Sequence, residues 1–209
     1  MKIKTPYYSI LRTGILLALI FVSQKVVSQT VLLDSLTLDT MHAYTSLEEA
    51  LKNPEKVVKL ELRKNKLKSF PMEILKFPNL QYLDLSKNSI KELPIEISQL
   101  KNLQYFAISK NSLEEFPPQI GDLSNLYYLN ANQNELTSIP HSIGKLIKLR
   151  NLDLWSNNID GFPEELKELK SLKVLDLRVI LIPDAQQNNI QAMLPNAKVY
   201  FSPYCKCQQ

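Results

Sequence analysis

A 23-residue period runs through most of this 209-residue chain. Six segments align without a gap; they begin at Val57, Leu80, Leu103, Leu126, Leu149 and Leu172. If each segment is numbered from its first residue, apolar side chains fill positions 1, 4, 6 and 11. In the first five segments Asn fills position 9 and Pro fills position 15. This period predicts a solenoid, because so short a unit cannot bury its apolar face alone and its neighbours must complete the core.

The apolar residues at positions 4 and 6 alternate with polar ones, as they do in a short strand with one buried face. Stacked segments would pair these strands in parallel, about 4.8 Å apart. The Asn at position 9 follows the strand, where its amide can donate to and accept from main-chain groups that the turn leaves unpaired. We therefore expect a structural ladder of five residues, namely Asn65, Asn88, Asn111, Asn134 and Asn157.

The strand half of the segment, LQYLDLSKNSI from Leu80, resembles the leucine-rich repeat, and the resemblance extends over about residues 45–201. The second half, LPIEISQL from Leu93, is similar to the Ras-suppressor and plant Ras-group-related type of this repeat. The resemblance implies an α/β solenoid. Such a solenoid has a curved parallel sheet on its concave side, short helical or extended segments on its convex side, and helical end caps. For function it implies protein–protein interaction.

The first 28 residues have the pattern of a secretory signal peptide. Lys2, Lys4 and Arg12 precede a short apolar run from Gly14 to Val22, and Ser28 offers a small residue at which cleavage can occur. A spanning helix needs roughly 20 apolar residues. We therefore expect cleavage after Ser28, an exported product (periplasmic, surface-held or secreted), and no transmembrane segment in the mature chain.

Charge and composition exclude several classes of function. The chain has 25 Lys and Arg against 21 Asp and Glu, and the predicted leader holds four of the basic residues and no acidic one. The mature chain is thus formally neutral, which argues against nucleic-acid binding. Four glycines are too few for a dinucleotide fingerprint and a phosphate-binding loop. No catalytic or metal-binding motif occurs, so we expect no enzyme, no cofactor and no metal site.

The remaining segments flank the repeats at 57–182. Residues 29–44 are expected to be an N-terminal linker, and 45–56 a capping helix opened by Ser46 and Glu49 as a capping box. Residues 183–201 are predicted to form a C-terminal cap of a helix, which Asp184 can open, and a strand. The tail, 202–209, holds Cys205 and Cys207, which could be incidental, pair in a disulfide, or bind a metal.

Strand positions 3, 5 and 7 point away from the core, and we call the surface that they form the concave face. The candidate partner-binding residues on it are Tyr82, Asp84, Tyr105, Tyr128, Asn130, Asn132, Asp153, Trp155 and Arg178. Exposed Tyr and Trp beside Arg and Asp are typical of interaction hot spots. An alternative for the three tyrosines is that they stabilise the sheet by packing on neighbouring strands.

These observations predict an exported, monomeric, non-enzymatic module that binds another protein through its concave face. Two alternatives remain open. Aromatic rings beside Asp and Asn also suit a carbohydrate- or envelope-binding structural protein. If the leader is not a true signal, an intracellular signalling scaffold is the better hypothesis.

Overall fold

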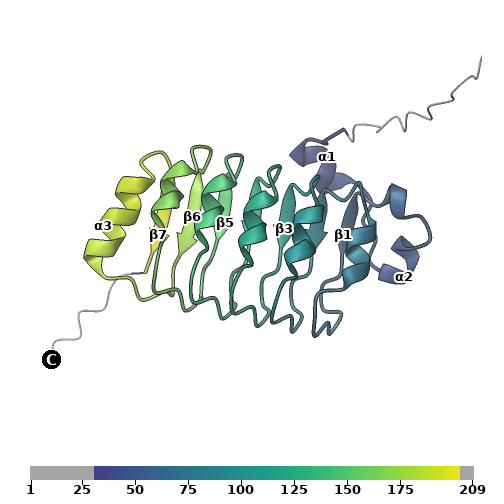
Figure 1. Cartoon of the computed structure of the whole chain (residues 1–209), viewed down its shortest axis with the longest axis horizontal. Helices are drawn as coiled ribbons and strands as arrows, with labels where there is room; N and C mark the ends of the chain where they lie inside the picture. Colours follow the sequence, from purple (N-terminus) through teal and green to yellow (C-terminus); the bar gives the residue numbers. More distant parts are fainter. Residues whose placement is uncertain (1–30, 203–209) are drawn as a thin grey trace, which may run out of the picture.

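The computed structural model describes residues 31–202, and in this part of the chain seven parallel strands form one sheet in chain order (Figure 1). The strands are β1 (Lys59–Glu61), β2 (Tyr82–Asp84), β3 (Tyr105–Ala107), β4 (Tyr128–Asn130), β5 (Asn151–Asp153), β6 (Val174–Leu177) and β7 (Lys198–Phe201). From β1 to β6 each residue pairs with the residue 23 positions later, so the sequence period sets the register. The predicted α/β leucine-rich repeat solenoid is confirmed.

Short 3-10 helices return the chain on the other side of the core. They are η1 (Pro54–Lys56), η2 (Met72–Lys76), η3 (Ile95–Gln99), η4 (Pro118–Asp122), η5 (His141–Lys145) and η6 (Glu164–Glu168). The position-15 proline immediately precedes each helix from η2 to η6, with φ between −73° and −66°. Proline fixes φ near this value, so it prepares the chain to enter the helix.

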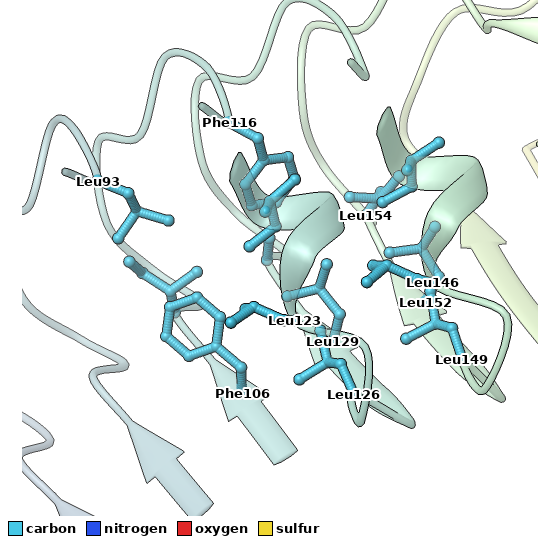
Figure 2. Close-up of a cluster of buried hydrophobic side chains, with 14 of the residues drawn as sticks. Leu93, Phe106, Phe116, Leu123, Leu126, Leu129, Leu146, Leu149, Leu152 and Leu154 are labelled. Carbon is cyan, nitrogen blue, oxygen red and sulfur yellow. The ribbon is translucent and has the colours of Figure 1, made fainter. Parts of the chain in front are cut away.

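The core lies between the sheet and the 3-10 helices (Figure 2). Within one repeat, Leu126, Leu129 and Ala131 come from the strand side and Ile143 comes from the helix side, and all four are fully buried. Phe106 takes the place of a leucine at position 4 and is also fully buried. The core is therefore one continuous column to which every repeat contributes, as the period predicts.

The position-9 asparagines join neighbouring repeats by side-chain hydrogen bonds. Asn134 donates to the carbonyls of Ile108 and Ala131, each at 3.0 Å, and accepts from the main-chain N–H of Leu113 at 3.0 Å. The same pattern occurs at Asn88, Asn111 and Asn157. Asn65 departs from the expected ladder: it is exposed and donates to the Arg63 carbonyl of its own repeat, because no earlier repeat offers it a partner.

The two ends of the core are covered differently. At the first end, α2 (Leu47–Ala50) buries Ala50, and Ser46 accepts a 3.4 Å hydrogen bond from the N–H of Glu49. At the other end, α3 (Asp184–Met193) buries Ile190 and lies against η6, next to β7 (Figure 1). Pro183, and not Asp184, is the N-cap of α3; Asp184 is its first residue. The predicted opening residue of this helix was therefore wrong by one position.

The prediction of a linker at 29–44 was wrong for the residues that the structure describes. Residues 31–33 and the helix α1 (Ser35–Thr40) pack against the first strands (Figure 1). The ammonium of Lys59 donates to the carbonyls of Leu38 and Asp39, both at 3.0 Å, and Leu38 is fully buried. The segment lacks the 23-residue period, so the repeat pattern does not place it; contacts with distant residues do.

Two sequence predictions lie outside the described residues. These are the signal peptide at 1–28 and the Cys205–Cys207 pair.

Candidate protein-binding face

Three tyrosines at position 3 form a stack on the concave face. The ring centroids of Tyr82 and Tyr105 are 4.0 Å apart, and those of Tyr105 and Tyr128 are 4.3 Å apart. The ring planes of each pair agree within 3°. This geometry follows from the register, since equal positions of adjacent repeats lie opposite each other. The stack fits the alternative that these tyrosines stabilise the sheet.

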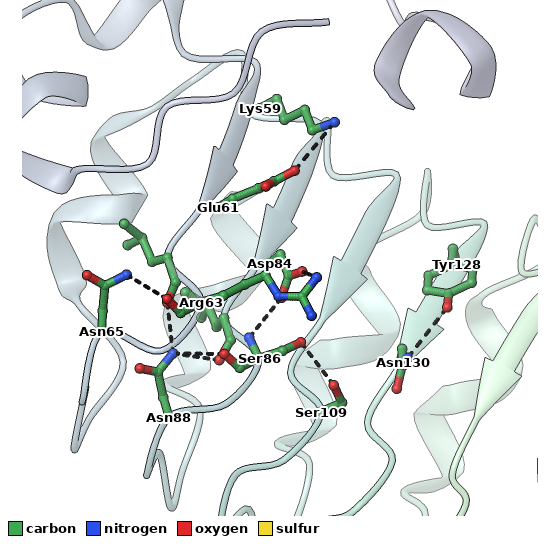
Figure 3. A network of polar contacts seen from close by, with 12 residues as sticks. Lys59, Glu61, Arg63, Asn65, Asp84, Ser86, Asn88, Ser109, Tyr128 and Asn130 are labelled. Atoms are coloured by element: carbon green, nitrogen blue, oxygen red, sulfur yellow. Dashed lines mark hydrogen bonds and ion pairs between the residues drawn. The ribbon is translucent and has the colours of Figure 1, made fainter. Parts of the chain in front are cut away.

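Two of the predicted partner-binding residues, Tyr82 and Asp84, are buried. Tyr82 is 8% exposed, beneath the Lys59 ammonium that lies 4.5 Å from its ring and bonds to the carbonyl end of α1. Asp84 is 2% exposed and lies 3.3 Å from the Arg63 guanidinium (Figure 3). The prediction that Tyr82 and Asp84 are free to bind a partner was wrong, because Lys59, held by α1, covers Tyr82 and Arg63 pairs with Asp84.

Burial also changes the acidity of these phenols. It raises the pKa of Tyr82 to about 12, and it raises the pKa of Tyr105 above its ordinary value as well. The neighbouring phenols and the Asp84 carboxylate add to the rise at Tyr105. Tyr82 and Tyr105 are therefore neutral hydrogen-bonding groups at physiological pH.

The open part of the concave face lies on β4, β5 and the residues that follow them. Tyr128, Asn130, Asn132, Asp153 and Trp155 are all half-buried there. The Asn132 amide donates to a carboxylate oxygen of Asp153 at 2.6 Å, and the main-chain N–H of Trp155 donates to the other at 3.1 Å. These bonds hold the polar groups in fixed positions while one side of each remains accessible.

Asp153 carries a raised pKa, chiefly because burial disfavours its charged form; the hydrogen bond from Asn132 opposes the rise. Arg178, which is exposed, donates through Nη2 to Asp176 at 2.6 Å and through Nε at 2.9 Å. These two hydrogen bonds hold the Arg178 guanidinium at the edge of the open part of the concave face. Together the groups can bind a ligand through stacking, hydrogen bonds and charge.

The arrangement brings no catalytic set together in residues 31–202. His141, which donates through Nδ1 to the carboxylate of Glu165 at 2.8 Å, lies on η5 at the convex side. In the same part of the chain no three His, Cys, Asp or Glu side chains are placed to hold a metal ion. None of the helices described here is long and apolar enough to cross a bilayer.

Sequence reasoning missed two residues at position 2 that hold the amino-terminal segment, Gln81 and Gln104. Gln81 donates to the carbonyl of Val31 at 3.0 Å and accepts from the N–H of Leu33 at 2.8 Å. Gln104 donates to the Leu33 carbonyl at 2.8 Å and to Gln81 Oε1 at 2.9 Å. A repeated Gln at one strand-edge position was the signal available in the sequence.

A family model described as a leucine-rich repeat region matches residues 44–197. The chain belongs to the leucine-rich repeat proteins. No curated protein matches the chain.

Solved structures with the same fold come from bacteria and plants. A leucine-rich repeat protein of Leptospira interrogans is 32% identical, with a TM-score of 0.65, over 78% of this chain and 47% of its own. Internalin C2 of Listeria monocytogenes is 27% identical, with a TM-score of 0.64, over 73% of this chain and 64% of its own.

The plant receptor kinase GASSHO1/SCHENGEN3 of Arabidopsis thaliana is similar through its leucine-rich repeat ectodomain. It is 26% identical, with a TM-score of 0.60, over 72% of this chain and 18% of its own, and its structure holds CASPARIAN STRIP INTEGRITY FACTOR 2. The chain thus matches about half of the Leptospira protein, less than two thirds of internalin C2 and a fifth of the plant receptor.

Proposed function

We propose that this chain is an exported, non-enzymatic module that binds another protein through the open part of its concave face. The observation that carries the proposal is the set of half-buried groups at Tyr128, Asp153 and Trp155, held in place by hydrogen bonds and stacking. A rigid surface of this kind loses little conformational entropy when it binds. Aromatic anchors beside charged groups are the usual source of binding energy in protein interfaces.

The comparisons support the class of partner. The plant receptor ectodomain was solved with a bound factor, and a similar plant peptide hormone receptor was solved with RGF2. The leader-like pattern at 1–28 supports export, and the LPxxIxxL half of the repeats supports the Ras-suppressor and plant Ras-group-related type. We propose that the mature chain, from Gln29, acts as a monomer, which light scattering on the purified protein would test.

The proposal is tested by affinity purification with the mature chain, 29–209, as bait. Trp155→Ala and Tyr128→Ala should each reduce the captured partner at least tenfold, provided that circular dichroism and the melting temperature show a folded protein. His141→Ala on the convex side is the matched control and should capture as much as the wild type. Equal capture by all three variants would refute the concave face as the binding surface.

A glycan array with the same variants distinguishes carbohydrate binding, the alternative function, from protein binding. Binding to defined oligosaccharides that Trp155→Ala abolishes, with no protein captured, would replace the proposed function by glycan recognition. The amino terminus of the exported protein, read by mass spectrometry, tests the leader. A chain that starts at Met1 and stays in the cytosol would favour an intracellular scaffold.

A further inference from the structure

The residues at position 2 form a continuous row along the edge of the concave face, where the strands begin. We call this the position-2 row; it consists of Gln81, Gln104, Tyr127, Arg150 and Lys173. Main-chain hydrogen bonds of 2.8 to 2.9 Å join each member to the next, from Gln104 N–H to Gln81 carbonyl and so on to Lys173. The row is therefore as regular as the sheet itself.

The first two members of the row already hold a piece of chain. Gln81 and Gln104 bind residues 31–33, and all three contacts with this segment go to main-chain atoms: the carbonyl of Val31 and the N–H and carbonyl of Leu33. Recognition through main-chain atoms does not depend on the side chains of the bound segment. Gln81 and Gln104 thus hold a polypeptide backbone, and the contacts of residues 31–33 are confined to this first part of the row.

Beyond this segment the row borders an open pocket of about 500 Å³. The chain's own amino-terminal segment forms one wall, at Leu33, Asp34 and Ser35. The other wall includes Tyr127, Asn151 and the basic side chains of Lys148 and Arg150. The pocket starts at Gln104, where the contacts with the own segment end. A second polypeptide segment could continue along the row from this point.

The open part of the row is positively charged. Arg150 is exposed, and within residues 31–202 it forms no ion pair with an acidic side chain. Lys148 lies in the same pocket, where its ammonium donates to the Asn125 amide oxygen at 2.7 Å, and Lys173 follows in the row immediately before β6. The one carboxylate in the wall, Asp34, accepts hydrogen bonds from the N–H and hydroxyl of Thr37 as the N-cap of α1; these bonds lower its pKa, so it stays charged, and Lys148 and Arg150 outnumber it.

We propose that the position-2 row binds an extended, acidic segment of the partner protein. This segment lies along the row beyond Gln104, where the contacts with residues 31–33 end. A carboxylate of that segment pairs with the guanidinium of Arg150, and the ammonium groups of Lys148 and Lys173 add to the attraction. Arg binds carboxylates through two parallel hydrogen bonds, which makes such a pair strong and directional. The inference rests on the proposed function, because it names the kind of protein segment that the same module binds.

The test is a selection from a phage-displayed library of random dodecapeptides on the immobilised mature chain, 29–209. Enriched peptides should be rich in Asp and Glu. The strongest peptide is then synthesised with a fluorophore and titrated by anisotropy. Arg150→Gln should weaken its binding at least tenfold and Lys173→Gln several-fold. Lys145→Gln is the matched control: its ammonium lies on η5 at the convex side, 3.4 Å from the Asp122 carboxylate, and binding should stay within threefold of the wild type.

Three outcomes would overturn the inference: no enrichment, enrichment of peptides without acidic residues, or equal affinity of the wild type and Arg150→Gln. Arg150-dependent binding of oligogalacturonate without any peptide binding would also overturn it, because the occupant would then be a glycan. The proposed function is judged separately. If Trp155→Ala still abolishes partner capture while the peptide selection fails, the concave face remains the proposed binding surface. Only the binding of an acidic segment along the position-2 row is then refuted.

Discussion

The ring of Tyr105 lies 4.0 Å from the ring of Tyr82 and parallel to it within 2°, yet Tyr82 is buried and Tyr105 is half-buried. The stack therefore runs from the covered part of the concave face into its open part. It ends at Tyr128, beside the groups proposed to bind the partner. The same row of tyrosines can therefore stabilise the sheet at its covered end and offer a binding surface at its open end.

Tyr105 lies between two rings, so its loss should be costly. We expect Tyr105→Ala to lower the free energy of unfolding by about 2–3 kcal/mol, because it removes two aromatic contacts and part of a buried side chain. Tyr105→Phe keeps the stack and should stay within about 1 kcal/mol of the wild type. Urea unfolding followed by circular dichroism measures both. Equal stability of the alanine and phenylalanine variants would show that the stack contributes nothing.

The raised pKa of Tyr82 makes the free energy of unfolding fall as the pH rises in the alkaline range. The folded-state pKa is about 12, against 10.0 for an unperturbed phenol, so the unfolded chain loses this proton first. The contribution to stability is complete below pH 10 and is lost as the pH rises through 12. Urea unfolding across this range should show a steeper decline for the wild type than for Tyr82→Phe. Parallel curves for the two proteins would contradict the burial of this phenol.

The asparagine ladder should contribute strongly where it joins two repeats. Asn134→Ala leaves the N–H of Leu113 without its partner, and it removes one of two amide donors from the carbonyls of Ile108 and Ala131, which keep those of Asn111 and Asn157. An unsatisfied buried group costs about 1–3 kcal/mol, and we expect a loss of that size. Asn65→Ala is the control at an exposed position and should change stability by less than about 0.5 kcal/mol. Both values come from denaturant titrations, and equal effects would refute the ladder.

Close packing of neighbouring 3-10 helices requires glycine in two repeats. A Cβ at Gly144 would lie 2.7 Å from the carbonyl oxygen of Glu165, whereas a Cβ at Gly161 would meet no atom within 4 Å. Gly144→Ala should therefore destabilise the protein by about 1–3 kcal/mol through overpacking, and Gly161→Ala should not. Differential scanning calorimetry of the two variants checks this. A Gly144→Ala protein as stable as the Gly161→Ala control would show that the helices can separate at no cost.

Asp153 is held in a position that disfavours its charge. Its folded-state pKa is raised above the ordinary 3.8, so its contribution to stability is present below that value and is lost as the pH rises through the folded-state pKa. Asp153→Asn removes this loss, and at pH 7 the variant should be at least as stable as the wild type. The advantage should disappear toward pH 3. A variant less stable than the wild type at pH 7 would show that the carboxylate, despite its burial, stabilises the fold.

The pattern of the repeats was enough to predict the strands, their parallel order and the core. Leu129 is buried and Tyr128 lies on the concave face because a strand alternates its side chains, and a fixed period repeats that alternation in register. The bridging role of Asn134 was also predictable from its spacing. Asn65 has the same spacing but no earlier repeat beside it, and the pattern does not show what a terminal copy lacks.

The solenoid and the identity of the residues on its concave face follow from the amino acid sequence, because they depend on local alternation and on contacts between equal positions of adjacent repeats. Which of those residues remain accessible depends on how distant segments pack in three dimensions. Residues 31–40 have no period, and they reach their place through contacts such as those of Gln81 with Val31, 50 residues away. Residues 31–40 show no period that predicts these contacts, which bury Tyr82 and leave Tyr128 and Arg150 open to a partner.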